Sequence, residues 1–197
     1  MSLFNYNAKE IHCKIVYYGP SLGGKTTNIQ WMYQSLASDQ KSKLSVLNTE
    51  VERTLLFDFL PLDVGDIRGF KTRFHLYSVP GQIVYDATRK LILQGIDGII
   101  FVADSQADRM DENKQSFENL EKNLYQQGYN IKDIPLIMQY NKRDLPNALP
   151  MNELRKHLNR YNSPEIEACA VDGKGVLESF KLVSKSIIQV LKGGAAG

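Results

Sequence analysis

Residues 19 to 26 read Gly19-Pro20-Ser21-Leu22-Gly23-Gly24-Lys25-Thr26 and match G-x-x-x-x-G-K-[ST] at every fixed position. An apolar, β-branched run from Ile11 to Tyr18 precedes this loop, and apolar residues at helical spacing follow it from Thr26 to Leu36. In a strand, loop and helix of this kind, backbone N–H groups and the positive end of the helix dipole converge on one point. The segment therefore predicts an anion site, where Lys25 reaches phosphate oxygens and the hydroxyl of Thr26 ligates Mg²⁺.

The residues expected to contact phosphate groups lie together in this loop and at the start of the helix. They are Gly19, Ser21, Leu22, Gly23, Gly24, Lys25, Thr26 and Thr27. The alternative is a glycine-rich turn without a ligand, which the flanking strand and helix disfavour.

The rest of the chain alternates between strand and helix patterns. We expect an antiparallel hairpin formed by Leu55 to Leu60 and Lys71 to Val79. Further strands are expected at 98–103, 135–140 and 165–170, and further helices at 85–93, 110–127, 151–158 and 176–191. This order predicts an α/β fold with a mostly parallel six-stranded sheet, one antiparallel edge hairpin and helices on both faces. Residues 1–192 are expected to form a single domain and residues 193–197 a flexible tail.

A second motif, Asn141-Lys142-Arg143-Asp144, follows the predicted strand at 135–140. The carboxyl ends of parallel strands are where ligands of such folds bind. A carboxylate can accept hydrogen bonds from the ring N–H and the exocyclic amine of guanine, whereas adenine has no such donor pair on that edge. Asp144 is therefore the expected guanine selector, with Asn141 and Lys142 beside it. A polar turn after a strand is the alternative interpretation of the motif alone.

A third fragment, Cys169-Ala170-Val171, ends the last predicted strand. Its backbone amides are candidates to contact the carbonyl oxygen of guanine. Taken alone, the fragment is more typical of a buried core strand.

Composition excludes several classes of protein. The 197 residues contain 24 Lys and Arg against 22 Asp and Glu, a formal net charge of +2, so charge alone indicates no nucleic-acid partner. The sequence has no pattern of a signal peptide, membrane span or lipid anchor, so we expect a cytoplasmic protein. Cys13 and Cys169 are far apart and are expected to be buried and reduced.

The longer strings resemble those of Ras-like small GTPases, and more closely the bacterial gliding-motility polarity GTPases of the MglA type. The likeness covers nearly the whole chain and is closest at 52–59, 69–77 and Val79-Pro80-Gly81-Gln82. It implies the three-layer P-loop fold of these GTPases and a switch that is on with GTP and off with GDP. It also implies a role in the front-to-rear polarity of a moving bacterial cell.

The resemblance assigns roles to four residues of the switch regions. Thr54 would complete the Mg²⁺ shell and Gly81 would sense the γ-phosphate. Gln82 would orient the attacking water, and Arg53 would act as an arginine finger supplied in cis. The implied catalytic set is thus Gln82, Arg53 and Lys25. For Arg53 and Gln82, the alternatives are a solvated surface arginine and a polar turn residue.

Two positions depart from the wider Ras pattern. Ser78 stands where most relatives have an aspartate that faces the water shell of magnesium, and we expect Asp58 to supply that charge from outside the direct ligands. A solvent-facing Asp58 is the alternative. Ser21 stands where a glycine is usual, and its hydroxymethyl group is expected to obstruct Gln82 or Arg53. This predicts tight nucleotide binding with slow intrinsic turnover.

The resemblance implies a GTPase-activating partner of the Roadblock type and effectors selective for the GTP state. We expect a monomer without a membrane anchor that partners recruit to a cell pole. Phe57, Phe59, Phe70 and Phe74 are either core residues or an apolar docking patch. Two rival functions stay open: a P-loop kinase, for which the motif at Asn141 would be accidental, and a GTP-binding scaffold in which Ser21 and Ser78 have abolished hydrolysis.

Overall fold

The structure is a computed structural model and describes residues 3–35, 45–47, 56–67, 69–81 and 86–193. These residues build an eight-stranded sheet in the order β3-β4-β5-β2-β6-β7-β8, with β1 paired to β2. The strands are β1 (Leu3–Asn5), β2 (Glu10–Tyr18), β3 (Ser45–Leu47), β4 (Leu56–Ile67), β5 (Phe70–Ser78), β6 (Gly98–Asp104), β7 (Leu136–Asn141) and β8 (Glu165–Glu167). The five strands from β5 to β8 in this order pair in parallel, and β1, β3 and β4 pair antiparallel to their neighbours.

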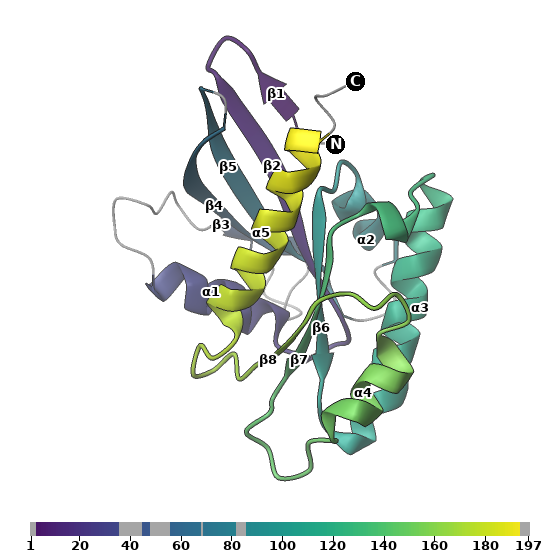
Figure 1. Ribbon diagram of the computed structural model, residues 1–197. Coiled ribbons are helices and arrows are strands. Elements are labelled where there is room, and N and C mark those ends of the chain that lie inside the picture. The colour runs from purple at the N-terminus through teal and green to yellow at the C-terminus, as the bar shows by residue number, and fades with distance from the viewer. Residues whose placement is uncertain (1–2, 36–44, 48–55, 68, 82–85, 194–197) are drawn as a thin grey trace.

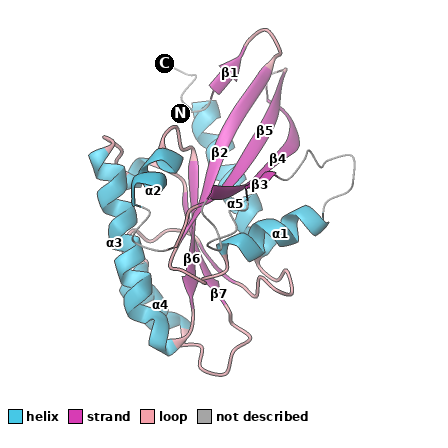
Figure 2. Ribbon diagram, turned by 180° about the vertical axis from the view of Figure 1, so that it is seen from behind, coloured by secondary structure: helices cyan, strands magenta, loops and turns pink. Residues whose placement is uncertain are grey.

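Helices cover both faces of the sheet (Figures 1 and 2). The helices α1 (Lys25–Ser35) and α5 (Val176–Gly193) lie on one face, and α2 (Asp86–Leu93), α3 (Met110–Gln126) and α4 (Met151–Leu158) lie on the other. Two short 3₁₀ turns, η3 (Ala107–Arg109) and η4 (Ile131–Asp133), precede α3 and β7. The predicted three-layer Ras-like fold is therefore confirmed.

The alternation of side chains on β2 explains why two helical layers are required. Ile15 and Tyr17 enter the core beneath α1 and α5, where they meet residues such as Ile29 and Phe180. Val16 and Tyr18 enter the core beneath α2, α3 and α4. Successive residues of a strand point to opposite faces, so the second half of β2, which is apolar at every position from Ile15 to Tyr18, needs cover on both sides.

The predicted six strands were too few. β1 and β3 have three residues each, too short to produce a recognisable alternation. The hairpin was predicted correctly, but β4 extends to Ile67, beyond the expected end at Leu60. Its Pro61 and Gly65 resemble strand breakers, yet a register shift between Asp63 and Asp66 accommodates the second half of the strand.

The last predicted strand is shorter than expected. β8 ends at Glu167, and Cys169 instead forms an isolated antiparallel bridge to Lys174. Phe74 is a core residue and Phe70 packs against the same core, whereas the side chains of Phe57 and Phe59 lie outside the described part of the structure. Within the described residues, no helix is both long enough and apolar enough to span a membrane.

Candidate functional site

The loop between β2 and α1 has the backbone shape of an anion cradle. Gly19 and Gly24 adopt φ values of 144° and 102°, which residues with a side chain rarely tolerate. A Cβ atom on Gly19 would lie 2.2 Å from the carbonyl oxygen of Val102, and one on Gly24 would lie 2.1 Å from Nδ2 of Asn141. Both glycines are therefore required by close packing as well as by the turn.

Lys25 begins α1 and folds back over this loop. Its Nζ donates hydrogen bonds to the carbonyl oxygens of Gly19 (3.0 Å) and Pro20 (2.6 Å), and the residue is 6% exposed. These two bonds hold the ammonium charge of Lys25 inside the loop. A phosphate group entering the loop would meet that charge directly.

The other loop residues surround this position. Gly23 is buried, and Ser21, Gly24, Thr26 and Thr27 are half-buried. Leu22 has φ of 60° and is 74% exposed, so it contributes its backbone to the loop while its side chain faces solvent.

The described residues contain no group of three or more His, Cys, Asp and Glu side chains that could hold a metal ion. The hydroxyl of Thr26, next to the loop, is a hard oxygen ligand. A site with few protein ligands suits Mg²⁺, which keeps several water molecules and binds substrate phosphates. The donor set therefore fits a magnesium ion that arrives with a nucleotide.

Asn141 holds three segments together at the carboxyl end of β7. Its Nδ2 donates to the carbonyl oxygen of Gly23 at 2.9 Å, and its Oδ1 accepts from the backbone N–H of Ala170 at 2.9 Å. The residue is 2% exposed. One buried amide thus fixes the phosphate loop relative to the segment Cys169 to Val171.

Lys142 is anchored by a carboxylate that sequence reasoning missed. Its Nζ lies 2.6 Å from Oδ2 of Asp104, a fully buried residue at the end of β6. Lys142 has φ of 64°, an uncommon conformation for a non-glycine residue. The ion pair therefore fixes the direction of a side chain that leaves a constrained backbone.

Arg109 connects this ion pair to the phosphate loop. Its Nη2 donates to the carbonyl oxygen of Ser21 at 3.0 Å, and its Nε lies 3.9 Å from Oδ2 of Asp104. Its Nη1 donates to Glu112 at 2.6 Å. The phosphate loop is thus held at Ser21 by α3 and its preceding turn, and at Gly23 by β7.

Asp144 is exposed, as a residue that meets a ligand from solvent must be. The thiol of Cys169 lies near it. Burial, together with hydrogen bonds to the carboxylates of Asp144 and Asp172, raises the pKa of Cys169 to about 11. The thiol therefore stays protonated at neutral pH and adds no charge to the base pocket.

In the fragment Cys169-Ala170-Val171, the backbone N–H groups of Cys169 and Ala170 already donate hydrogen bonds within the protein, contrary to the expectation that they would contact guanine. The N–H of Cys169 donates to the carbonyl oxygen of Lys174, and that of Ala170 donates to Asn141. Val171 is 70% exposed, whereas Ala170 is buried. A guanine carbonyl at Cys169 or Ala170 would have to share an amide that already has an acceptor.

One further chain of hydrogen bonds joins the phosphate loop to Gly175, which follows the base segment Cys169 to Val171. Asn28 donates to the carbonyl oxygen of Gly24 (2.9 Å) and accepts from Gln139 (2.9 Å), and Gln139 also donates to Ser179 (2.9 Å). Ser179 in turn donates to the carbonyl oxygen of Gly175 at 2.7 Å. This buried polar chain crosses the core from one loop to the other.

Gly81 lies against the phosphate loop at Ser21. A Cβ atom on Gly81 would be 2.3 Å from the α-carbon of Ser21, so only glycine fits here. Ser78 is fully buried at the end of β5, and the N–H of Val79 donates to the carbonyl oxygen of Tyr17 at 3.1 Å. The segment that carries Gly81 is therefore tied to the strand that leads into the loop.

The remaining expected residues are not described. Arg53, Thr54 and Gln82 lie outside the described ranges. Asp58 lies on β4, where only the course of the backbone is described. Its expected role near magnesium stays a prediction.

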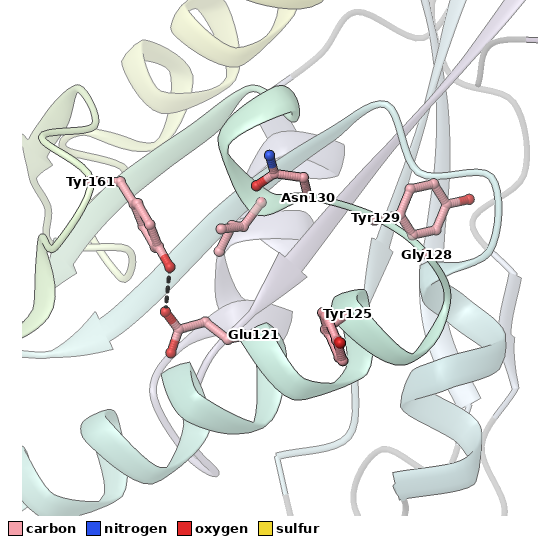
Figure 3. Close-up of a pocket in the computed structure, with 7 residues that line it drawn as sticks. Glu121, Tyr125, Gly128, Tyr129, Asn130 and Tyr161 are labelled. Atoms are coloured by element: carbon pink, nitrogen blue, oxygen red, sulfur yellow. Dashed lines mark hydrogen bonds between the residues drawn. The ribbon is translucent and has the colours of Figure 1, made fainter.

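A separate hollow of about 540 Å³ lies away from this site, at the end of α3 (Figure 3). Tyr125, Tyr129 and Tyr161 line it, and Tyr161 donates a hydrogen bond to Glu121 at 2.6 Å. None of its lining residues belongs to the phosphate loop or to the base segment.

Sequence reasoning missed the polar residues that hold the phosphate loop and the base motif in place. Gln139 interrupts an apolar strand and Asp104 ends one, Asn28 lies one helical turn after Gly24, and Arg109 follows an acidic residue in a loop. A polar residue inside or at the end of an otherwise apolar strand was the available signal, because burying it requires a partner.

Comparison with known proteins places the chain among small GTPases. A family model described as the ADP-ribosylation factor family matches residues 2–187. The mutual gliding-motility protein MglA of Myxococcus xanthus (strain DK1622) is 59% identical over 194 residues, which covers 98% of this chain and 100% of that protein. ADP-ribosylation factor-like protein 4C of Homo sapiens is 28% identical over 182 residues, 89% of this chain and 86% of that protein. ADP-ribosylation factor K of Dictyostelium discoideum is 32% identical over 118 residues, 57% of this chain and 60% of that protein.

Proposed function

Because the chain belongs to the ADP-ribosylation factor family and is a Ras-like small GTPase of the MglA type, we propose that it hydrolyses GTP to GDP and phosphate as a molecular switch. The observation that carries the proposal is the buried side chain of Asn141, which joins the phosphate loop to the base segment. A ligand that reaches both has phosphates at one end and a base at the other.

The loop from Gly19 to Thr27 holds the phosphates in this proposal. Lys25 exchanges the two carbonyl oxygens that it now contacts for oxygens of the β- and γ-phosphates. Asp144 accepts from the two donors of guanine, and Lys142, aligned by Asp104, lies beside it.

Thr26 and Thr54 would hold a magnesium ion, with Asp58 contributing its charge through the water shell. When bound, magnesium neutralises charge on the phosphates. The buried hydroxyl of Ser78 provides no charge for this purpose.

Hydrolysis is assigned to residues outside the described ranges, by likeness to the family. Gln82 orients the attacking water and Arg53 neutralises the charge that develops between the β- and γ-phosphates. The γ-phosphate orders Thr54 and Gly81, and its release frees them. A partner of the Roadblock type would accelerate this step, and effectors would bind the GTP state.

Binding is tested by identifying the nucleotide that copurifies with the protein and by calorimetry with GDP, GTP and ADP. We expect Asp144→Ala to weaken GDP binding by roughly a hundredfold, since two charge-assisted hydrogen bonds are lost. Asp133→Ala removes an exposed carboxylate remote from the site and should leave the affinity unchanged. Equal affinities for GDP and ADP, or no binding of either, would contradict the proposal.

Hydrolysis is tested separately by single-turnover phosphate release. Arg53→Ala and Gln82→Leu should each slow it, by roughly a thousandfold or more for the arginine. A second candidate function, a GTP-binding scaffold without hydrolysis, is favoured by the serines at positions 21 and 78. It predicts tight GTP binding without phosphate release, even when a Roadblock-type protein is added.

The cellular role is proposed from the name of the bacterial relative, a gliding-motility protein. We propose that the GTP state marks one pole of a gliding cell through its partners. Imaging a fluorescent fusion in the source bacterium tests this. The parent protein should gather at one cell pole. The Gln82→Leu variant, which is locked in the GTP state, should no longer be confined to one pole.

A further inference from the structure

The largest fully buried side chain in the described residues is an arginine, which belongs neither to the phosphate loop nor to the base motif. Arg89 lies on α2 and is 1% exposed. Its Nε donates to the carbonyl oxygen of Pro80 at 2.9 Å and its Nη2 donates to that of Gly81 at 2.6 Å. Its Nη1 donates to Oδ1 of Asn119 at 2.6 Å. A buried cation thus holds two consecutive carbonyl groups of the segment that lies against the phosphate loop.

Within the described residues, the three groups that accept these bonds from Arg89 are neutral. Desolvating a guanidinium group is costly, and hydrogen bonds to neutral dipoles compensate less than a carboxylate does. Each of these bonds therefore matters, because losing one would leave a charged donor unsatisfied in the interior. The segment Pro80-Gly81 cannot move away from α2 without breaking two of them.

The bond to the carbonyl oxygen of Pro80 fixes the peptide group between Pro80 and Gly81, whose N–H would contact a third phosphate. The carbonyl of Pro80 and the N–H of Gly81 belong to one peptide plane, and the described chain contains no cis peptide bond. In a trans peptide the C=O and N–H point in opposite directions. By holding the carbonyl, Arg89 fixes the direction of the Gly81 N–H, and its charge polarises the peptide toward stronger donation.

Other residues hold Arg89 itself in place. Asn119 also accepts from the hydroxyl of Tyr18 at 2.5 Å and donates to Asp86 at 2.9 Å. Asn123 and Lys90 contact the same carboxylate, at 2.9 Å each. Burial raises the pKa of Asp86, but the hydrogen bonds from Asn119, Asn123 and Lys90 together outweigh it and leave the pKa well below its usual range. The carboxylate that orders this cluster is therefore charged at any physiological pH.

We propose that Arg89 is a positioning residue that aims the N–H of Gly81 at the phosphate loop and so sets the preference for a nucleoside triphosphate over a diphosphate. Gly81 already lies against Ser21, where a Cβ atom would overlap its backbone. In the proposed binding mode, this N–H would contact a third phosphate and would not contact a diphosphate. The inference rests on the proposed function and adds to it a residue outside both nucleotide motifs.

The test compares the dissociation constants of GDP and of a non-hydrolysable GTP analogue, both with Mg²⁺, in Arg89→Met and Arg89→Lys. We expect the triphosphate-to-diphosphate affinity ratio to fall roughly tenfold in Arg89→Met, while GDP affinity changes less than about threefold. Arg89→Lys keeps the charge but has no planar fork to hold two carbonyls, so its ratio should fall by a smaller factor. Leu91→Ala is the matched control on the same helix, because this side chain is 63% exposed, and it should keep the parent ratio.

Asn119→Ala keeps the proposal testable if both arginine variants fail to fold, since Asn119 is only partly buried. It removes one acceptor of Arg89 and should also lower the triphosphate-to-diphosphate affinity ratio. A parallel loss of affinity for both nucleotides would reveal a merely structural role and overturn the inference, as would an unchanged ratio. Failure of the parent protein to bind GDP would instead overturn the proposed function.

Discussion

At the scale of single residues, buried polar side chains define the geometry of the site. Asn141 occupies the space between two loops, and its two hydrogen bonds are made to backbone groups on either side. Asp104 does the same for Lys142 and Arg109. Because an unsatisfied buried polar group is costly, each of these residues admits few alternative positions for the loops that it joins.

Ser21 carries a prediction about turnover. Its carbonyl oxygen accepts from Arg109 and its backbone lies against Gly81, so Ser21→Gly removes only the hydroxymethyl group and leaves both of these backbone interactions. If that group obstructs the catalytic side chains, Ser21→Gly should hydrolyse GTP at least several-fold faster in single-turnover assays, with unchanged GDP affinity. Equal rates in the two proteins would show that the serine is not the cause of slow turnover.

Cys169 carries a prediction about reactivity. The thiolate is the reactive form, and a pKa of about 11 leaves about a hundredfold less of it at pH 8 than the ordinary value does. The rate of thiol labelling at Cys169 should rise as the pH increases toward that pKa. Thiol labelling of the native protein, followed by mass spectrometry, should therefore be slow at Cys169 and fast after unfolding in guanidinium. Rapid native labelling at pH 8 would show that the thiol is not enclosed beside Asp144 and Asp172.

At the scale of elements, helix α1 links the phosphate loop to the base segment. The loop leads into the helix, and Trp31, two turns later, packs against Gly173 beyond Cys169. A Cβ atom on Gly173 would lie 1.9 Å from Cε2 of this tryptophan. The two ends of the site are thus joined on one side by this helix and on the other by β7.

Gly173→Ala tests this link, with Gly128→Ala as its control. The two glycines have φ of 79° and 77°, but a Cβ on Gly128 would meet no atom within 4 Å. The free energy of unfolding should fall by about 1 to 2 kcal/mol in both variants, because alanine is disfavoured in the left-handed conformation. In Gly173→Ala it should fall by about 1 to 3 kcal/mol more, because the added methyl group overpacks against Trp31. Urea denaturation should show this difference, and calorimetry should show weaker GDP binding for Gly173→Ala alone. Equal losses of stability would argue against close packing at Trp31.

At the scale of the whole molecule, one sheet brings the site together at the carboxyl ends of β2, β6 and β7. The phosphate loop follows β2, Asp104 ends β6 and Asn141 ends β7. These strands are neighbours in the sheet and run parallel, so their ends meet at the same edge. A ligand at this edge contacts segments from most of the length of the chain.

Bound nucleotide should therefore stabilise the whole fold. At a GDP concentration of about one hundred times the dissociation constant, linkage adds about 2.7 kcal/mol, which corresponds to about 5 to 11 °C in Tm for a domain of this size. Thermal denaturation with and without GDP and Mg²⁺ measures this, and ADP at the same concentration is the control. An equal rise with ADP would argue against guanine selection.

The sequence by itself determined the order of the elements, the phosphate loop and the base motif, because each of these is encoded in contiguous residues or in a short period. The strands and helices predicted around Gly19 to Thr26 and Asn141 to Asp144 match the structure closely. Only the tertiary structure revealed the short strands β1 and β3, the ion pair of Lys142 with Asp104, the two hydrogen bonds of Asn141 and the burial of Arg89. The bond between Gly23 and Asn141 joins residues 118 positions apart, and that between Lys142 and Asp104 spans 38. Local periodicity contains no information about such pairs, since their approach depends on how the strands are ordered in the sheet.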